Sequence, residues 1–328
     1  MKFVTYLNSG NKSQRFGFMM DGYVVDVLRA AIFMNEEKHE PDYLQIPSSL
    51  HSCLEDWEPN LIKLQRLQNE LEVEPIANLM ANGQHVSLQE SDVQLLPPIT
   101  NPSTFRDFYA FEQHVKAARK LRGLEMHPDW FRIPIFYFSN PNALYGHGAE
   151  IPYPKNTEEL DFELEFAVII ANGGRDIKAD DAERLIAGYT ICNDWSSRNL
   201  QREEMPMSLG PAKGKDFATS FGPYMVTPDE LADAWDNDGK LQLRMTCHVN
   251  DTLISDGNTN DLYHSFPTMI ERASMNANLV AGDYLGSGTV GTGCILELRP
   301  ENTGGWIQKG DTVRMEVERL GILENKII

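Results

Sequence analysis

This 328-residue chain has few cysteines, no long apolar run and no cluster of basic residues. Its four cysteines form no CxxC pair, which excludes a zinc ribbon and favours buried free thiols in a reducing compartment. No stretch approaches about 18 apolar residues and the N-terminus lacks an apolar signal region, so we expect a cytoplasmic protein that does not bind membranes. The net charge of −19 also argues against nucleic acid as a partner, because phosphate binding needs clustered lysine and arginine.

Two common catalytic motifs are also missing. The chain has no GxSxG sequence, so a serine hydrolase with a nucleophile elbow finds no support. The segment GSGTVG at residues 286–291 matches GxGxxG by its letters, but the CILEL that follows is predicted to be a strand. A dinucleotide-binding motif has to open a helix, so we interpret these glycines as room for a turn or for close substrate approach.

The hydrophobic pattern divides the chain into two units. Residues 1–97 are predicted to form a small N-terminal β-rich domain, with strands at FVTYL and YVVDVL and a helical stretch at about 59–82. Residues 98–328 alternate short strands with few helices and lack the strand–helix rhythm of a doubly wound sheet, which predicts a mostly β fold of mixed α+β type. Helices of this unit are predicted at about 104–121, 179–187, 195–204 and 262–274. Its strands are predicted at LEFAVII, AGYTICN, GPYMVT, LQLRMTCHVN, TGCILELR and DTVRMEVERL.

Four carboxylates stand out in three short segments, DFYAFEQH, DFELEFAVII and NDWSSRNLQ. They are Asp107, Glu163, Glu165 and Asp194. A set of oxygen ligands without a cysteine or histidine pattern suits Mg²⁺, Ca²⁺ or Mn²⁺ and not zinc. The sequence therefore predicts a site for a hard divalent cation.

Glu163 and Glu165 are two residues apart, so on a strand their side chains point to the same side. An edge strand with a solvated acidic face would explain this pair. However, the same side continues as Ala167 and Ile169, which are expected to be buried. Two carboxylates on a buried face repel each other unless a cation joins them.

Helical spacing adds further candidates to the site. Asp107 and His114 are seven residues apart, which places them on one face of the helix predicted at 104–121. Asp194, Arg198 and Gln201 follow the spacing i, i+4, i+7 and would share a face of the next predicted helix. The alternatives are a plain helix cap at Asp194 and a surface ion pair with Arg198.

Two further charged residues could complete the chemistry. Glu297, on the strand predicted at CILEL, could orient an imidazole and stabilise its charged form. Lys215, in the segment GKDFATS, could stabilise a developing oxyanion, although a solvated loop lysine is the alternative.

Taken in order, these segments resemble the fumarylacetoacetate hydrolase (fumarylacetoacetase) family. DFYAFEQH is similar to the family's DFYxxxQH, ELE to its metal-binding ExE, NDWSSRNLQ to NDWSARDxQ and GKDFATSFGPY to GKSFxTxxxPW. GSGTVGTGCILEL resembles the turn rich in glycine and threonine that leads to a late glutamate. The likeness spans residues of about 100–298 and implies a β-roll catalytic domain.

The resemblance also implies roles for individual residues. The four carboxylates would bind a divalent cation, Mg²⁺ or Ca²⁺, with Mn²⁺ as an alternative. A general base, the glutamate that orients it and three oxyanion-stabilising side chains would carry catalysis: His114, Glu297, Arg198, Gln201 and Lys215. The remaining implied residues are Tyr109 and Thr289 for substrate binding, and Thr219 near the metal.

The function that the resemblance implies is metal-dependent hydrolysis of a carbon–carbon bond in a small anionic β-diketo acid. The leading substrate is 4-fumarylacetoacetate, which aromatic amino-acid catabolism splits into fumarate and acetoacetate, and the family implies a homodimer. Met205 stands near the place of the family's substrate-contacting tyrosine and the 136–148 loop differs, so the substrate stays open. Alternatives are an acylpyruvate hydrolase, a 2-oxo acid decarboxylase or tautomerase on the same site, and a non-catalytic metal-stabilised binding protein.

Overall fold

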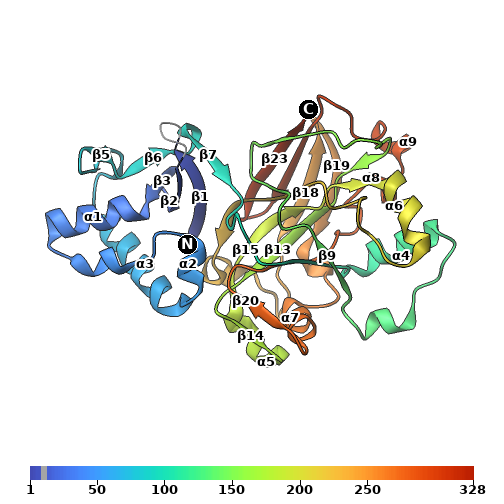
Figure 1. Cartoon of the computed structure of the whole chain (residues 1–328), viewed down its shortest axis with the longest axis horizontal. Coiled ribbons are helices and arrows are strands. Elements are labelled where there is room, and N and C mark those ends of the chain that lie inside the picture. The colour runs from blue at the N-terminus through green and yellow to red at the C-terminus, as the bar shows by residue number, and fades with distance from the viewer. Residues whose placement is uncertain (9–12) are drawn as a thin grey trace.

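The computed structural model describes residues 1–8 and 13–328 and shows a small N-terminal lobe beside a larger lobe (Figure 1). The larger lobe is built mainly of sheet and the small lobe adds helices to its own strands, so the fold is of the mostly β, mixed α+β type. The strands of the small lobe are β1 Lys2–Asn8, β2 Gln14–Met20, β3 Tyr23–Asp26, β4 Met80–Ala81, β5 Gln84–His85, β6 Ser87–Gln89 and β7 Val93–Leu96. Its helices are α1 Val27–Lys38, α2 Leu50–Leu54 and α3 Trp57–Leu71.

One 12-stranded sheet runs through both lobes, in the order β6-β3-β2-β1-β17-β15-β13-β21-β8-β9, with β7 beside β1 and β10 beside β17. The larger lobe contributes β8 Phe105–Phe108, β9 Phe136–Ser139, β10 Leu144–Tyr145, β13 Leu164–Ile170, β15 Ile186–Asn193, β17 Thr219–Val226 and β21 Tyr284–Gly286. The lobes join where β1 pairs with β17, with Phe3 opposite Met225. The boundary expected at residue 97 therefore has a hydrogen-bonded sheet across it, and the division into 1–97 and 98–328 stays a prediction.

A second sheet has five strands in the order β11-β23-β22-β18-β19. Its strands are β11 Glu150–Ile151, β18 Arg244–Val249, β19 Thr252–Asn258, β22 Thr312–Val317 and β23 Gly321–Ile327. Two short ribbons of the larger lobe pair β12 Leu160–Asp161 with β16 Ser196–Ser197 and β14 Gly173–Arg175 with β20 Asn278–Val280. The helices of this lobe are α4 Glu112–Leu121, α5 Ala179–Ala182, α6 Arg198–Glu204, α7 Phe266–Ser274, α8 Ile295–Leu298 and α9 Pro300–Thr303.

Strand β13 shows how the two hydrophobic cores divide around the large sheet. Every residue of its sequence LEFAVII is buried. Phe166 and Val168 belong to the core of the larger lobe, whereas Ala167 and Ile169 pack into a core shared with the small lobe. Alternating side chains of a strand point to opposite faces, so both faces of β13 are covered.

Two predicted elements turned out to be of the wrong type. The helix expected at 104–121 is in fact strand β8, a short connection and helix α4, because Phe105–Phe108 is buried and pairs with β21 and β9. The strand expected at TGCILELR is instead the short helix α8. Its first backbone N–H groups, those of Ile295 and Leu296, donate to the carboxylate of Asp161, which fixes the start of the helix.

Other boundaries moved. YVVDVL is a strand only as far as Asp26, whose side chain accepts from the backbone N–H of Arg29 and caps α1. The helix expected at about 59–82 ends at Leu71. The helices expected to begin at 195 and 262 begin at Arg198 and Phe266.

Candidate metal centre and active site

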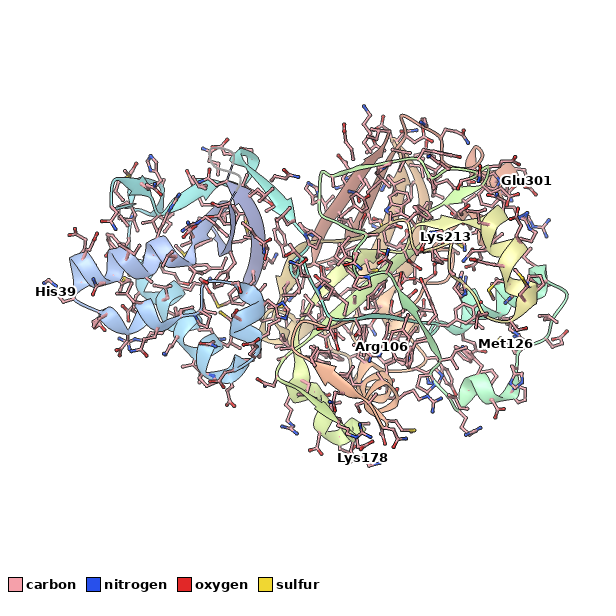
Figure 2. All side chains as sticks on the ribbon, in the orientation of Figure 1. His39, Arg106, Met126, Lys178, Lys213 and Glu301 are labelled. Carbon is pink, nitrogen blue, oxygen red and sulfur yellow. The ribbon has the colours of Figure 1, made fainter. Side chains whose placement is uncertain are left out.

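Four buried carboxylates meet in the larger lobe, and each offers an oxygen within 4.8 Å of the others. The four are those singled out in the sequence: Asp107, Glu163, Glu165 and Asp194. Asp107 lies on β8, Glu165 on β13 and Asp194 directly after β15, so neighbouring parts of one sheet carry them. In Figure 2 the labelled Arg106, which precedes Asp107 on β8, lies within this lobe and marks that strand. The group is set inside the fold and not on a solvated edge.

The structure brings the four predicted carboxylates together but contradicts several of the arguments that pointed to them. Glu163 and Glu165 lie together and are only 5 % and 0 % exposed, so the solvated-face alternative is wrong. The shared helical face of Asp107 and His114 is also wrong, because the two residues lie on β8 and α4. Asp194 precedes α6 and does not cap it, so its helical spacing with Arg198 and Gln201 has no structural meaning.

The electrostatics of the group fit a bound cation. Burial, followed by the charge of Asp194, raises the pKa of Asp107 well above its ordinary value. Burial and the charge of Asp107 do the same to Glu165. Among the described residues, no hydrogen-bond partner faces Asp107 Oδ1 or Glu165 Oε2, although both atoms are buried. Oxygens that repel one another without donors are suitable ligands for a hard divalent cation.

A glycine allows these oxygens to lie so close to the backbone. Gly286 on β21 pairs with Asp107 in parallel register. A Cβ atom at Gly286 would lie 2.5 Å from Asp107 Oδ1 and 3.2 Å from Glu165 Oε2. The sequence predicted room for a turn or for substrate in this segment, whereas at Gly286 the close approach is to two carboxylates.

Lys215 bridges two of the carboxylates. Its Nζ contacts Glu163 and lies 2.5 Å from Asp194 Oδ2, and all three side chains are buried. Burial alone would raise the pKa of Glu163, but Lys215 and Arg198 outweigh it and lower this pKa to about 2. Glu163 is therefore the firmly ionised member of the group.

Arg198 connects the four carboxylates to helix α8 through Asp161. It lies 2.8 Å from Asp161 and 2.8 Å from Glu163, and it donates to Gln201 Oε1 over 3.0 Å. Asp161 also accepts from the start of α8, as described above. Asp161 was not among the residues predicted from the sequence, although it opens the segment DFELEFAVII; an acid just before a buried strand was its only signal.

His114 on α4 and Glu297 on α8 form a buried hydrogen bond of 3.0 Å between Nδ1 and Oε2. Burial would raise the pKa of Glu297, but the hydrogen bond with His114 outweighs it and lowers this pKa. The Tyr109 ring packs edge-on against the imidazole, with 5.6 Å between the centroids. Glu297 thus lies on a helix and not on the expected strand, yet it meets the predicted partner.

Three hydroxyl groups line the carboxylates. Thr289 donates to Glu165 over 3.3 Å and Thr219 donates to Asp194 over 3.5 Å. Tyr137, on β9, donates to Asp194 as well and was missed by the sequence analysis. It lies in the segment 136–148, which was expected to be a loop that differs from the family pattern, although residues 136–139 in fact form β9. Thr219 and Thr289 therefore both lie beside the four carboxylates, and their roles near a metal and at the substrate stay predictions.

A mostly β fold with four converging carboxylates beside a histidine–glutamate pair defines the class of the protein as a candidate metal-dependent enzyme. The sequence profile of the family described as "Fumarylacetoacetate (FAA) hydrolase C-terminal" matches residues 103–328. Because this match covers more than half of the sequence, the chain belongs to the fumarylacetoacetate hydrolase family.

Relatives within the family have different activities in their names. A human protein named mitochondrial oxaloacetate tautomerase FAHD2A is 28% identical over 248 residues, which cover 74% of this chain and 71% of that protein. A fumarylacetoacetase of Arabidopsis thaliana is 29% identical over 259 residues, which cover 64% of this chain and 61% of that protein. The family is therefore established, whereas the reaction is not fixed by these relatives.

Solved structures agree with the fold along the whole chain. A fumarylacetoacetate hydrolase from Exiguobacterium antarcticum has a TM-score of 0.69 at 23% identity, with 100% of this chain and 99% of that chain covered. A maleylpyruvate hydrolase from Sphingobium has a TM-score of 0.67 at 20% identity, again covering 100% and 99% of the two chains. Within residues 1–8 and 13–328, no helix has the length and apolar character needed to cross a membrane.

Proposed function

We propose that the protein hydrolyses a carbon–carbon bond in a β-diketo acid with the help of a divalent cation, and that 4-fumarylacetoacetate is its leading substrate. The observation that carries this proposal is the hydrogen bond between His114 and Glu297, because it supplies an oriented base close to the carboxylate group. Mg²⁺ or Ca²⁺ would be held by the four carboxylates, with Mn²⁺ as an alternative. Bound there, the cation would act as a Lewis acid toward the substrate's carbonyl oxygens.

The base would work through the free side of the imidazole. When Nδ1–H donates to Glu297, Nε2 carries the lone pair and can accept a proton from water. Glu297 then stabilises the imidazolium that forms. General base assistance of this kind typically supplies a factor of about 10²–10⁴ in rate.

The side chains of Lys215 and Arg198 are candidates for stabilising negative charge in the reaction. Lys215 and Arg198 are both engaged with carboxylates, which fixes their positions before substrate binds. Charges held in a buried site stabilise developing negative charge without a reorganisation cost. We therefore keep the predicted oxyanion role for Lys215, Arg198 and Gln201, with Tyr109 and Thr289 as predicted substrate contacts.

The experiment that tests this function is a side-by-side assay of the purified chain with Mg²⁺, Mn²⁺ or Ca²⁺. Fumarylacetoacetate, a set of acylpyruvates and oxaloacetate would be supplied in turn, and the products separated and identified. Fumarate and acetoacetate from the first substrate would support the proposal. Cleavage of acylpyruvates alone would move the assignment to an acylpyruvate hydrolase, and no turnover of any substrate would favour a binding protein.

A second candidate is a tautomerase of a 2-oxo acid, and the relatives named oxaloacetate tautomerase favour it. Tautomerisation breaks a C–H bond and forms an O–H bond, or the reverse, and needs neither an attacking water nor carbon–carbon bond cleavage. His114 could carry that proton with the same hydrogen bond to Glu297. Interconversion of keto and enol oxaloacetate without cleavage products would select this candidate.

The oligomeric state, the compartment and the partners of the enzyme are part of the proposal. We propose a homodimer that acts on a small anionic substrate in the cytoplasm, without nucleic acid or membrane as a partner. The net charge of −19 supports the exclusion of nucleic acid. Analytical ultracentrifugation would decide between monomer and dimer.

A further inference from the structure

A second group of metal-ligating side chains lies beside the four carboxylates. His114, Glu163 and Cys294 each offer a ligand atom, and these atoms lie within 4.8 Å of one another. All three side chains are buried, with exposed fractions of 4 %, 5 % and 0 %. A thiol, an imidazole and a carboxylate are the mixture that zinc and related cations bind, whereas Mg²⁺ and Ca²⁺ prefer oxygen alone.

The imidazole is already oriented as a metal ligand. Its Nδ1 is bound to Glu297 over 3.0 Å, so Nε2 is the atom left for a ligand. Histidines that bind zinc commonly donate their other ring N–H to a carboxylate in this way, which fixes the tautomer. The bond that prepares His114 as a base therefore also prepares it to bind a soft cation.

The distances require only a small contraction. Tetrahedral zinc with Zn–N of about 2.0–2.1 Å and Zn–S of about 2.3 Å places its ligand atoms about 3.5 Å apart. From a limit of 4.8 Å, the three atoms would have to approach by about 1.3 Å at most. Cys294 directly precedes helix α8, which also carries Glu297, so a modest shift of this segment would close the site.

The thiol has no task in the proposed hydrolysis. Burial, followed by the charge of Asp161, raises the pKa of Cys294 well above its ordinary value, while Arg198 and the backbone N–H of Glu297 act in the opposite direction. A protonated, buried thiol is a poor nucleophile. A zinc-class cation would replace the proton, because it binds the thiolate.

The positive charges next to Glu163 oppose the binding of a further cation. Glu163 is paired with Lys215 and with Arg198, so a new cation competes with two positive charges for this carboxylate. The thiolate and the two carboxylates Asp161 and Glu297 nearby offset that repulsion. We expect His114 and Cys294 to supply most of the affinity and Glu163 to complete the site.

From this geometry we propose that His114, Cys294 and Glu163 form a second site, for a zinc-class cation, whose occupation blocks the base and inhibits the enzyme. The binding part stands on the three side chains alone. The inhibition part rests on the proposed function, because it requires His114 to be the base. The second site shares Glu163 with the oxygen-only group, whereas His114 and Cys294 belong to the second site alone.

The test uses the full chain loaded with excess Mg²⁺ and titrated with Co²⁺ as a spectroscopic probe. We expect a thiolate-to-cobalt charge-transfer band at one equivalent of Co²⁺, and its displacement by one equivalent of Zn²⁺. Cys294→Ser should lose the band, whereas Cys53→Ser should keep it, since Cys53 is an equally buried thiol in the small lobe. Absence of the band in the unaltered chain, or its persistence in Cys294→Ser, would overturn the proposal whether or not the enzyme turns over.

Activity gives the second readout. Zn²⁺ added at fixed Mg²⁺ should inhibit turnover. Cys294→Ser should need at least about tenfold more Zn²⁺ for the same inhibition, because the variant lacks the thiolate ligand. With Mg²⁺ alone, Cys294→Ser should keep kcat within a factor of about three, because the thiol takes no part in the reaction. Equal sensitivity of both chains to Zn²⁺, despite a cobalt band that depends on Cys294, would reject inhibition through this site and leave the binding site standing. No turnover of any substrate would instead reject the proposed function.

Discussion

His114 and Glu297 share a buried hydrogen bond of 3.0 Å although 183 residues separate them in the chain. Helix α4 delivers the imidazole and helix α8 delivers the carboxylate. The bond engages Nδ1 and leaves Nε2 free of Glu297, so both the proposed base and the proposed soft-metal site depend on it.

Glu297→Gln tests this bond directly. A glutamine amide can donate to Nδ1, which would leave the proton on Nε2 and remove the lone pair that the reaction needs. We expect kcat to fall by about 10²-fold, at the lower end of what general base catalysis contributes, with little change in melting temperature. Steady-state kinetics with the best substrate would measure it, and Glu301→Gln, an exposed neighbour on α9, is the matched control. Unchanged kcat would show that Glu297 does not orient the base.

His114→Ala separates chemistry from metal binding. Removing the base should lower kcat by about 10²–10⁴-fold, while the four carboxylates keep their affinity for Mg²⁺. Kinetics and calorimetric Mg²⁺ titration of the same preparation would provide both numbers. A variant that turns over at the rate of the unaltered chain would place the base elsewhere.

Glu165→Gln should abolish or strongly weaken divalent-cation binding. The change replaces a buried carboxylate oxygen that has no other partner among the described residues. In the unaltered chain, a cation at about 100 times its Kd should stabilise the fold by about 2.7 kcal/mol, and this increment should vanish in the variant. Thermal denaturation with and without Mg²⁺ measures it, with the exposed Glu150→Gln as control. An equal increment in Glu165→Gln would contradict the metal assignment.

Asp161→Asn should destabilise the fold and misplace α8. The change removes a buried charge that holds Arg198 at 2.8 Å and accepts from the start of α8. Breaking one partner of a buried ion pair costs about 3–5 kcal/mol, and since Arg198 keeps Glu163 we expect about 3 kcal/mol. Urea denaturation would measure the loss. A change below about 1 kcal/mol would mean that the pair contributes no more than a surface ion pair.

His264 should make the stability depend on pH. Burial lowers the pKa of this histidine below 6.5, although its bond to the Trp130 carbonyl acts in the opposite direction. The unfolded chain therefore binds this proton more readily than the folded chain. The contribution of His264 to stability is fully present above about pH 6.5 and is lost as the pH falls below that value. His264→Gln keeps a donor for Trp130 but does not titrate. Its melting temperature should fall less than that of the unaltered chain between pH 7.5 and 5.5, and parallel curves would contradict this.

More of the chemistry of the site than of its geometry could be predicted from the sequence. Residue types in order were enough to find the four carboxylates and the partner of His114. Their secondary structure was not, because a spacing of seven fits a helix as well as it fits a strand, a turn and a helix. Likewise CILELR alternates like a strand, and what makes it helical is Asp161, 134 residues away, which accepts from Ile295. Local patterns contain no information about such a distant partner.

The shared core between the lobes bears on how far the chain can be shortened. Ala167 and Ile169 continue the face of β13 that carries Glu165, and they pack into the core that includes Phe3 of the small lobe. An artificial chain starting at residue 98 would expose this face to water and leave the β1 edge of β17 unpaired. The small lobe thus shares the core on the face of β13 that carries Glu165, and we expect a truncated chain to aggregate instead of yielding a smaller enzyme.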